Sequence, residues 1–415
     1  MAKRGNADTR TAPSNLRTTQ LSEIISGFSR PEPSYVPALD VLVPMIGREY
    51  AAALTGAYLG RHFAPIQACS AGLTGYLASW VADQSLQPLA GAASTPVQGW
   101  DYAFGDAYRT LMNEAGDHAG VSASIAAHLG ACGIRGAWKS SFERPMRLRW
   151  DDWLLPPATA VSVQADRGSA VVEYSGTDGD GLVSLTVLDG HWEAVGAERH
   201  RRVERHGVTF TVLVSDALTM RDYEDLTERA VATIPPAMFG AFDEALDIIA
   251  EYTPEYLPWV SRTIHQMFLL HPRPGKVESG SVEHYLGLVH LTAHPEPLPI
   301  AELLVHEATH QYMNVASKLQ PLDDGTDSQV YWSPAVNMER PISKIVAAFH
   351  AFGNVMLFYR RCRDAGLANR GECERQEALL GGWMDHLIPP LVDNAALTPT
   401  GNALCQPLLR ALRER

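Results

Sequence analysis

The sequence predicts an α+β protein that is mainly helical, and three observations along its 415 residues support this fold class. Apolar side chains recur at three- and four-residue spacing through most of the first 135 residues, which is the period of an amphipathic helix. Between residues 161 and 213, apolar and polar residues alternate between turn signals, as they do in antiparallel strands. Helical periodicity returns beyond residue 221 and continues to the C-terminus.

These patterns divide the chain into four segments. Residues 1–18 are polar and basic, without the apolar stretch of a secretory signal, and we expect a disordered tail there. Residues 19–155 are expected to form an N-terminal helical lobe, and residues 156–220 a small central antiparallel β module. Residues 221–415 form a C-terminal helical lobe in this division.

Apolar stripes justify the helices of the first lobe. Leu39, Val43 and Ile46 begin a stripe that predicts a helix over residues 36–62. The same periodicity predicts further helices at 66–83, 100–115 and 121–131.

Alternating runs justify the strands of the β module, and they lie at 169–174, 182–188, 192–195 and 208–214. Asp189 and Gly190 form one turn signal between them, and the Gly- and Asp-rich loop 176–181 forms another. Asp178 and Asp180 in that loop lack the ligand spacing of a calcium-binding loop, so a hairpin turn is favoured.

The last lobe combines helices with two strands. Strand-like runs at 264–270 and 282–292 are followed by Pro297 and Pro299, which are suited to the first turn of a helix. Further helices are predicted at 222–234, 238–252, 341–362, 371–386 and 399–412.

Composition excludes several classes of protein. With 46% hydrophobic and 20% charged residues, the chain is typical of a soluble globular protein. The formal net charge of -13 argues against nucleic acid or an anionic membrane as the main partner. The five cysteines are an odd number without C-x-x-C spacing, which favours reduced thiols. No run of about eighteen apolar residues appears, so we expect a cytoplasmic protein.

The most informative motif is His306-Glu307-Ala308-Thr309-His310, which matches the pattern H-E-x-x-H. Two histidines four residues apart stand on one helical face, so both imidazoles can reach one metal ion. Glu307 lies close enough on the same helix to touch a metal-bound water. A strand immediately before such a helix is typical of zincin-like catalytic lobes, where an edge strand pairs with extended substrate. We therefore expect a zincin-like metal-binding lobe, with the strand at 282–292 as the one that pairs with substrate.

A third protein ligand is needed, and the sequence offers alternatives. The metzincin pattern fails, because Met313 stands where that pattern continues and no glycine turn follows. Asp323 and Asp324 are expected in a loop, and Glu339 lies farther along the chain. His350, on the margin of the apolar stripe of the predicted helix 341–362, is the preferred third ligand. Three histidines suit zinc or non-haem iron equally well.

The region from His306 to Tyr359 resembles a family of H-E-x-x-H proteins encoded with ribosomally made peptide natural products (RiPPs). The matching pieces are 306–310, Tyr331-Trp332-Ser333-Pro334, Glu339-Arg340-Pro341-Ile342 and Phe349-His350-Ala351-Phe352. Members of this family are understood to be iron(II)- and α-ketoglutarate-dependent β-hydroxylases that act on side chains in precursor peptides. The resemblance covers about a quarter of the chain well.

This resemblance implies Fe(II) and α-ketoglutarate as cofactors and a ribosomal precursor peptide as partner. The distal carboxylate of α-ketoglutarate needs a cation, and Arg340 is the first candidate because guanidinium binds carboxylate bidentately. Lys344 is a second cation nearby, and Tyr331 and Ser333 offer hydroxyl groups. Glu307 would then orient the metal site or bind the metal itself.

Two other functions fit the same residues. A zinc metallopeptidase of the gluzincin-like type would use Glu307 as general base, with His350 or Glu339 as third ligand. A non-catalytic peptide-binding protein would keep only a structural metal. Whether the chain forms a homodimer or needs a partner protein is left open by the sequence.

Overall fold

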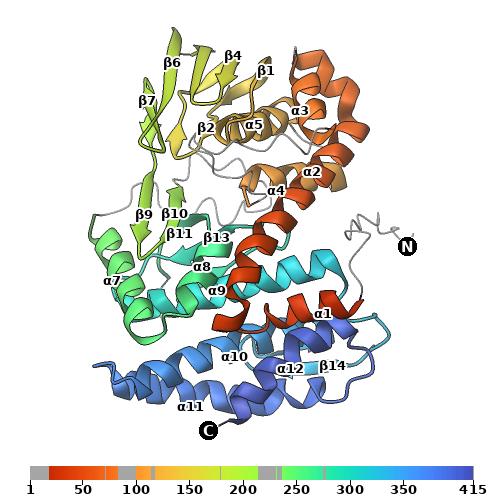
Figure 1. Cartoon of the computed structure of the whole chain (residues 1–415), viewed down its shortest axis with the longest axis vertical. Coiled ribbons are helices and arrows are strands. Elements are labelled where there is room, and N and C mark those ends of the chain that lie inside the picture. Colours follow the sequence, from red (N-terminus) through yellow and green to blue (C-terminus); the bar gives the residue numbers. More distant parts are fainter. Residues whose placement is uncertain are drawn as a thin grey trace.

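The computed structural model describes residues 18–70, 72–82, 100–113, 117–177, 179–213, 230, 236–273 and 277–414. Residues 1–17 of the predicted tail, nearly all of the predicted helix at 222–234 and Asp178 lie outside the described residues, and Thr18 begins a helix. Within the described part the fold is α+β with helices predominating, as predicted. Its elements gather around two large hydrophobic cores, one in the upper half of Figure 1 and one in the lower half.

The upper core is continuous in sequence, and the lower core is not. The upper lobe is defined here by buried residues from Ala51 to Trp192. The lower lobe takes its core from residues 21–46 and then from residues 203–411, with Trp100 in addition. Helix α2 (Val36–Cys69) supplies apolar side chains to both, and in Figure 1 it runs between the two halves of the molecule.

The upper lobe packs helices against a five-stranded antiparallel sheet. The helices are α3 (Leu73–Ala82), α4 (Tyr102–Asn113) and α5 (His118–Ala131). The strands, in spatial order, are β1 (Gly136–Met146), β4 (Ala158–Asp166), β5 (Ser169–Gly176), β6 (Gly179–Leu188) and β7 (His191–Val195). A separate three-stranded sheet joins β2 (Arg149–Trp150), β3 (Trp153–Leu154) and β8 (Glu198–Arg199).

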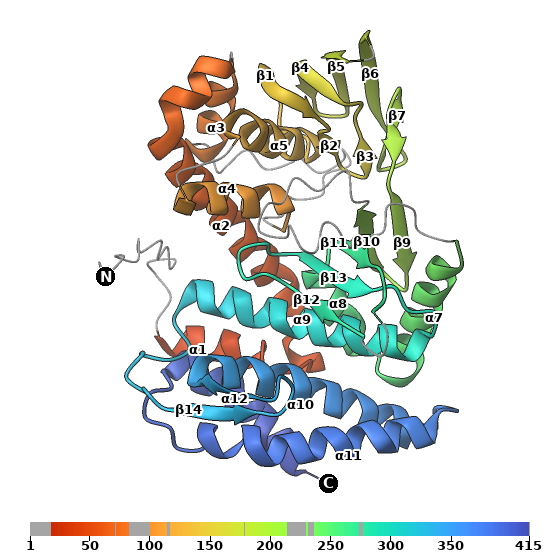
Figure 2. The same ribbon diagram turned by 180° about the vertical axis from the view of Figure 1, so that it is seen from behind.

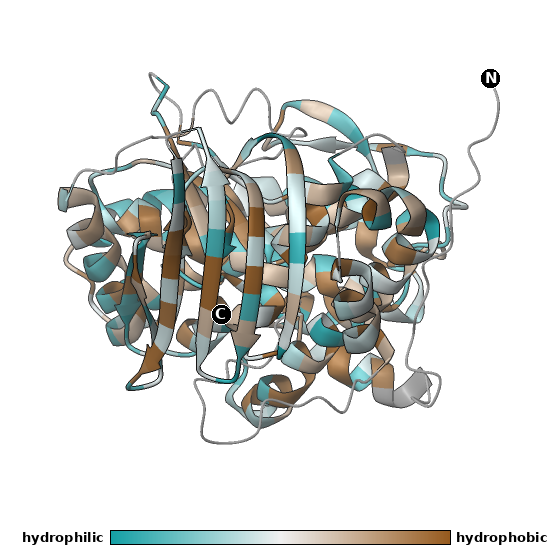
Figure 3. Ribbon diagram, turned by 90° about the horizontal axis from the view of Figure 1, so that it is seen from above, coloured by the Kyte–Doolittle hydropathy of each residue, from teal (hydrophilic) through white to brown (hydrophobic). Residues whose placement is uncertain are grey.

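Alternation of side chains explains why one face of the five-stranded sheet is buried. Val172, Val183 and Leu185 point inward and are almost fully buried, whereas Val171 and Leu182 on the opposite face are exposed. Figure 3 shows the alternation as changes of colour along neighbouring strands. The predicted turn between β6 and β7 is confirmed: Asp189 and Gly190 both have positive φ, of 51° and 84°, as a tight hairpin requires.

The lower lobe contains a second five-stranded sheet, which is mixed. Its order is β12 (Ser279–Gly280), β13 (Leu288–Thr292), β11 (Gln266–Leu270), β10 (Val208–Leu213) and β9 (Arg201–Arg205). The three central strands are mutually parallel, and the two outer strands pair antiparallel to them. Every residue of β11 and β13 is buried, which is typical of parallel strands that are covered on both faces.

Helices complete the lower lobe. They are α1 (Thr18–Ser26), α7 (Pro236–Tyr252), α8 (Tyr256–Thr263), α9 (Pro297–Leu319), α10 (Ile342–Asp364), α11 (Arg370–Leu387) and α12 (Pro399–Arg413). In Figure 2, α9 lies below the mixed sheet, with α10, α11 and α12 farther below. A hairpin of β14 (Val330–Ser333) and β15 (Met338–Pro341) connects α9 to α10.

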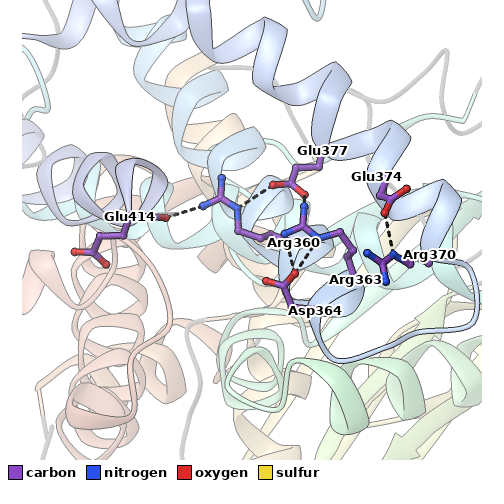
Figure 4. Close-up of polar contacts among 7 residues, drawn as sticks. All are labelled: Arg360, Arg363, Asp364, Arg370, Glu374, Glu377 and Glu414. Atoms are coloured by element: carbon purple, nitrogen blue, oxygen red, sulfur yellow. Dashed lines mark hydrogen bonds and ion pairs between the residues drawn. The ribbon is translucent and has the colours of Figure 1, made fainter.

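Ion pairs hold α10 and α11 together along their polar margin (Figure 4). Glu377 on α11 accepts hydrogen bonds from Arg360, at 2.9 Å, and from Arg363. Arg360 also donates to the backbone oxygen of Glu414, at 3.2 Å, which ties the end of α12 to the same cluster. The buried face of α10 is thereby fixed against its neighbours.

Helix α10 is also the one described helix with the length and hydropathy of a membrane span, and 72% of its apolar window is buried inside the protein. Burial of that extent is typical of a core helix of a soluble protein. The apolar composition of α10 is therefore explained by packing within the lower lobe.

Three sequence predictions differ from the observed elements. Residues 136–146, which we expected in the helical lobe, form the long strand β1 that opens the upper sheet. The predicted strand 282–292 is a strand only from Leu288, because the chain turns at Gly287, where φ is +84°. The predicted β module is shared between two sheets, since β9 and β10 join the lower one.

Candidate metal centre

Helix α9 carries the H-E-x-x-H motif across the middle of the lower lobe. The helix begins at Pro297, whose missing N–H costs nothing in a first turn, and its apolar side chains face the lower core. One turn separates His306 from His310, and their Nε2 atoms lie 3.1 Å apart. The two rings stand nearly perpendicular, at 82°. The two imidazole nitrogens therefore lie at hydrogen-bond distance from each other, and their use as metal ligands stays a prediction.

Burial keeps both imidazoles neutral near physiological pH. Desolvation, together with a smaller contribution from the charge of Lys344 on α10, lowers the pKa of His310 to about 4. Burial likewise holds the pKa of His306 well below its ordinary value, and the neighbouring His310 contributes. A neutral imidazole presents a lone pair, which is the form that binds a metal. His306 retains 13% of its side-chain exposure, so the site is not sealed.

Glu307 is fully buried beside this pair. One of its carboxylate oxygens accepts a hydrogen bond of 2.5 Å from Ser279 Oγ on β12 and lies 3.9 Å from His306 Nε2. The other oxygen has no hydrogen-bond partner within the described residues. Burial raises the pKa of Glu307 to about 7, while the hydrogen bond from Ser279 and the nearby hydroxyl of Ser281 oppose that shift. A carboxyl group with this pKa can take up or release a proton near neutral pH.

The short strand β12 brings these serines to the site. In the strand order of the lower sheet, β12 is an edge strand, and its neighbour is β13. Gly280 faces His290 across the pair so closely that a Cβ there would lie 2.6 Å from the imidazole. The expectation that residues 282–292 offer the pairing edge to substrate is thus wrong, because β13 has β11 on one side and β12 on the other. No residue pattern pointed to Ser279 or Ser281, since they fall between the predicted strands 264–270 and 282–292.

A cavity of about 510 Å³ lies next to the first turns of α9. Its walls include Glu302 and Leu303 from α9 and Tyr359 from α10. Tyr359 donates a hydrogen bond of 2.6 Å to Glu302, and burial raises the pKa of that carboxyl. Glu302 precedes His306 by one helical turn, but neither His306 nor His310 is part of the lining of this cavity.

His350 occupies a different environment from the one expected of a third ligand. The side chain is 1% exposed, and its Nε2 lies 2.9 Å from the backbone oxygens of both Phe28 and Ser29 at the end of α1. Its Nδ1 is buried without a partner in the described part of the chain. Across the described residues, no group of three His, Cys, Asp or Glu side chains is arranged to hold a metal ion. Third-ligand status for His350 stays a prediction.

The other predicted site residues lie in the hairpin and at the start of α10. Tyr331 pairs with Arg340 across the hairpin and donates a hydrogen bond of 2.8 Å to Asp327. Ser333 is fully buried, and its hydroxyl has no partner among the described residues. Glu339 is exposed opposite Trp332. Of the two predicted cations, Lys344 is the one whose charge acts on the pKa of His310.

Comparison with known proteins adds no assignment to this geometry: no protein-family model and no curated protein matches the chain. The residues around α9 are therefore the basis for any statement about function. They provide two neutral imidazoles, a buried carboxyl and a nearby cation.

Proposed function

We propose that this protein is an iron(II)- and α-ketoglutarate-dependent oxygenase that β-hydroxylates a side chain of a ribosomally made precursor peptide. The observation that carries the metal is the 3.1 Å approach of His306 Nε2 and His310 Nε2. The choice of iron and α-ketoglutarate is supported by the resemblance of four segments between His306 and Tyr359 to RiPP β-hydroxylases. We place this reaction in the cytoplasm.

The chain's own residues fit two metal ligands and leave two choices for a third. His306 and His310 would bind through Nε2, since both rings are neutral. Glu307 would complete a set of two histidines and one carboxylate, which suits non-haem iron. His350 would complete a set of three histidines through its unpartnered Nδ1. When bound, iron and α-ketoglutarate together supply the activation of oxygen for hydroxylation.

Lys344 would anchor the distal carboxylate of α-ketoglutarate. Lys344 is exposed in the first turn of α10, and its charge contributes to the lowered pKa values of His310 and of Glu283. Arg340 lies four residues earlier, on β15. An ammonium group next to a metal ligand attracts an anion into the site by direct charge interaction. The precursor peptide would then reach the site along β12, whose edge can accept an extended strand.

A zinc metallopeptidase is the second candidate, and one observation favours it. The raised pKa of Glu307, at about 7, suits a general base that takes a proton from a metal-bound water. A peptide-binding protein with a structural metal is the third candidate. Partners other than the peptide, including a second copy of the chain, are compatible with all three.

Two measurements on the full chain separate these candidates. Protein prepared without oxygen is loaded with Fe(II) or with Zn(II), and succinate formation from α-ketoglutarate is followed with a candidate precursor peptide. We expect succinate from the Fe(II)-loaded protein and not from the Zn(II)-loaded protein. The mass of the peptide should increase by one oxygen atom. Cleavage of the peptide with zinc, without succinate, would establish the metallopeptidase instead. Binding of the peptide without either reaction would establish the binding protein.

A further inference from the structure

A second cavity, of about 360 Å³, lies between the two lobes. Its walls include His128, Cys132 and Arg149 from the upper lobe and His265 and Gln266 from the lower lobe. Figure 2 shows the elements that enclose it, with α5 and β2 above and β10 and β11 below. Neither the histidine pair of α9 nor Glu307 is part of its lining.

Three side chains on this wall form a linked series of acid, imidazole and thiol. Asp101 Oδ2 lies 3.2 Å from His128 Nδ1. His128 Nε2 lies 3.7 Å from Cys132 Sγ, near the limit of a hydrogen bond to sulfur. The four-residue spacing of His128 and Cys132 at the end of α5 places both on the same helical face. A thiol next to a base that is itself oriented by a carboxylate is the arrangement of an activated nucleophile.

Asp101 is held in place by contacts from three directions. Its Oδ1 accepts the backbone N–H of Ala103 at 3.0 Å, and its Oδ2 accepts the side-chain amide of Gln266 at 2.6 Å. The Arg149 guanidinium also donates to Oδ2. An oxygen of Asp101 next to His128 Nδ1 favours the tautomer that carries the ring proton on Nδ1. The lone pair of His128 Nε2 is then directed toward the Cys132 thiol.

Arg149 offers a buried donor that no group among the described residues uses. Two of its nitrogens donate to Asp101 and to the backbone oxygen of Asp151. Its Nε is buried without a hydrogen-bond partner in the described residues, and the side chain is only 8% exposed. A buried unpaired donor in a cavity wall is suited to negative charge that develops on a bound molecule.

We propose that Cys132, His128 and Asp101 form a second, metal-independent active site that hydrolyses a small ester or thioester. His128 Nε2 takes the thiol proton while Cys132 Sγ bonds to the carbonyl carbon. His128 returns that proton to the alcohol or thiol that leaves, and an S-acyl group remains on Cys132. Water then adds to the acyl carbon with His128 as base, which releases a carboxylic acid and restores the thiol. Asp101 is a positioning residue that acts through His128.

The cavity limits the class of substrate. Its volume lies at the lower end of the range for small-molecule sites, so a compact acyl group fits and a folded protein segment does not. Arg149 Nε–H would stabilise the oxyanion of the tetrahedral intermediate. Esters and thioesters need only modest activation of the leaving group, which one imidazole supplies.

The test uses the full chain, treated with a chelator, and p-nitrophenyl acetate as the probe. We expect a burst of one p-nitrophenolate per chain and acetylation of Cys132, located by peptide mass spectrometry. His128→Gln should slow acylation by about 100-fold and make its rate rise more steeply with pH, because solvent hydroxide must then take the thiol proton. Asp101→Asn should give a smaller loss, with the same change in the pH profile. The matched control is Cys69→Ser, which removes a half-buried thiol outside this cavity and should leave acylation unchanged.

A measurement on the unmodified chain does not depend on how the variants fold. Iodoacetamide labelling compares Cys132, which is 5% exposed, with the more accessible Cys69. Faster alkylation of Cys132 despite its burial supports the site, since thiol reactivity follows activation as well as access. Slower alkylation of Cys132, acetylation at another residue or unchanged acylation in folded His128→Gln overturns the proposal. Loss of acylation on chelation also overturns it and assigns the activity to the metal centre.

Discussion

His310 and His350 lie on neighbouring helices and both have a lowered pKa, but their ring nitrogens have different partners. Burial lowers the pKa of each to about 4. His350 Nε2 lies 2.9 Å from two backbone oxygens, whereas His310 Nε2 faces the Nε2 of His306 at 3.1 Å. One of these two nitrogens can donate a hydrogen bond to the other, and in the proposed function both would instead direct their lone pairs to one metal ion. The comparison teaches that the direction of the nitrogens, more than the number of histidines, distinguishes a metal site from a core contact.

His265 extends the comparison to a third buried histidine. Its Nε2 lies 3.2 Å from the backbone oxygen of Arg262, and its ring stacks on Trp100 at an interplanar angle of 11°. Burial lowers its pKa to about 4 as well. His265 therefore belongs with His350 in its use of a backbone acceptor, and the His306–His310 pair stands apart.

The largest expected effect comes from breaking the pair itself. His310→Ala should weaken metal binding by at least about 100-fold, because it removes one of two converging ligands. His350→Gln keeps a donor for the Phe28 and Ser29 oxygens. We expect its metal affinity to fall by less than His310→Ala if Glu307 is the third ligand. Isothermal titration with Zn(II) or Co(II) measures both, and equal losses in folded variants would assign His350 as a ligand.

The next effect concerns the cation beside the pair. Lys344→Met should raise the KM for α-ketoglutarate by about tenfold, because an ammonium that acts on His310 would no longer attract the distal carboxylate. Arg340→Met is the matched control on the adjacent hairpin and should change that KM by less than about threefold. Steady-state succinate formation gives both values. A larger effect from Arg340→Met would exchange the roles of the two residues.

The pH dependence of the unfolding free energy tests the histidines whose ring nitrogens lie next to backbone oxygens, and His265 is the example. The folded pKa of His265, about 4, lies below the ordinary value, so the unfolded chain takes up the proton first as pH falls. The stability that depends on neutral His265 is thus complete above about pH 6.5 and is lost as pH falls toward 4. Between pH 7 and about pH 5, this histidine accounts for a loss on the order of 1–2 kcal/mol.

Urea unfolding of His265→Gln at the two pH values measures this contribution. The variant should lose less stability on acidification than the unmodified chain does. The expected difference follows from burial of the ring, which is the main cause of its lowered pKa. An identical pH dependence in the two proteins would remove His265 from the explanation.

The smallest expected effect is on the unfolding free energy, and it concerns α10, the helix that carries His350. Glu377→Gln weakens the cluster that binds α10 to α11 in Figure 4 and should lower the unfolding free energy by about 1 kcal/mol. Glu374→Gln removes an exposed pair with Arg370 on the same helix and should cost less than about 0.5 kcal/mol. Chemical denaturation of both variants provides the measurement. Equal costs would show that the cluster does not fix α10.

Long periodic segments of the sequence were predictable, and contacts between distant segments were not. The helices at α9, α10 and α11 follow from apolar spacing and proline placement, and the two histidines of α9 follow from the motif. Helix α8 and the hairpin strands β14 and β15 are too short to give a periodic pattern of apolar residues. Ser279 reaches Glu307 only because β12 pairs with β13, and sequence spacing does not encode that register.

The environment of His350 shows the same limit within the site. Its position on a helix margin was predictable from spacing, but its contact with Phe28 and Ser29 spans more than 300 positions of the chain. A ring nitrogen next to a carbonyl and one next to a metal have the same sequence signal, because only tertiary packing decides the neighbour. The proposed Cys132–His128–Asp101 series has no sequence signal for a related reason, since only tertiary packing brings Asp101 next to His128.

The way α2 joins the two cores has a consequence for synthesis on the ribosome. Every residue of the upper core has been made by Trp192, whereas the lower core needs residues as late as Ala411. The upper lobe can therefore fold before the lower-lobe residues that pack against the first half of α2 have been synthesised. Apolar residues of that half, such as Val43 and Ile46, stay uncovered until α8, the helix of the lower lobe that α2 contacts, has emerged. A chaperone that shields nascent apolar segments should bind this stretch longer than any part of the upper lobe.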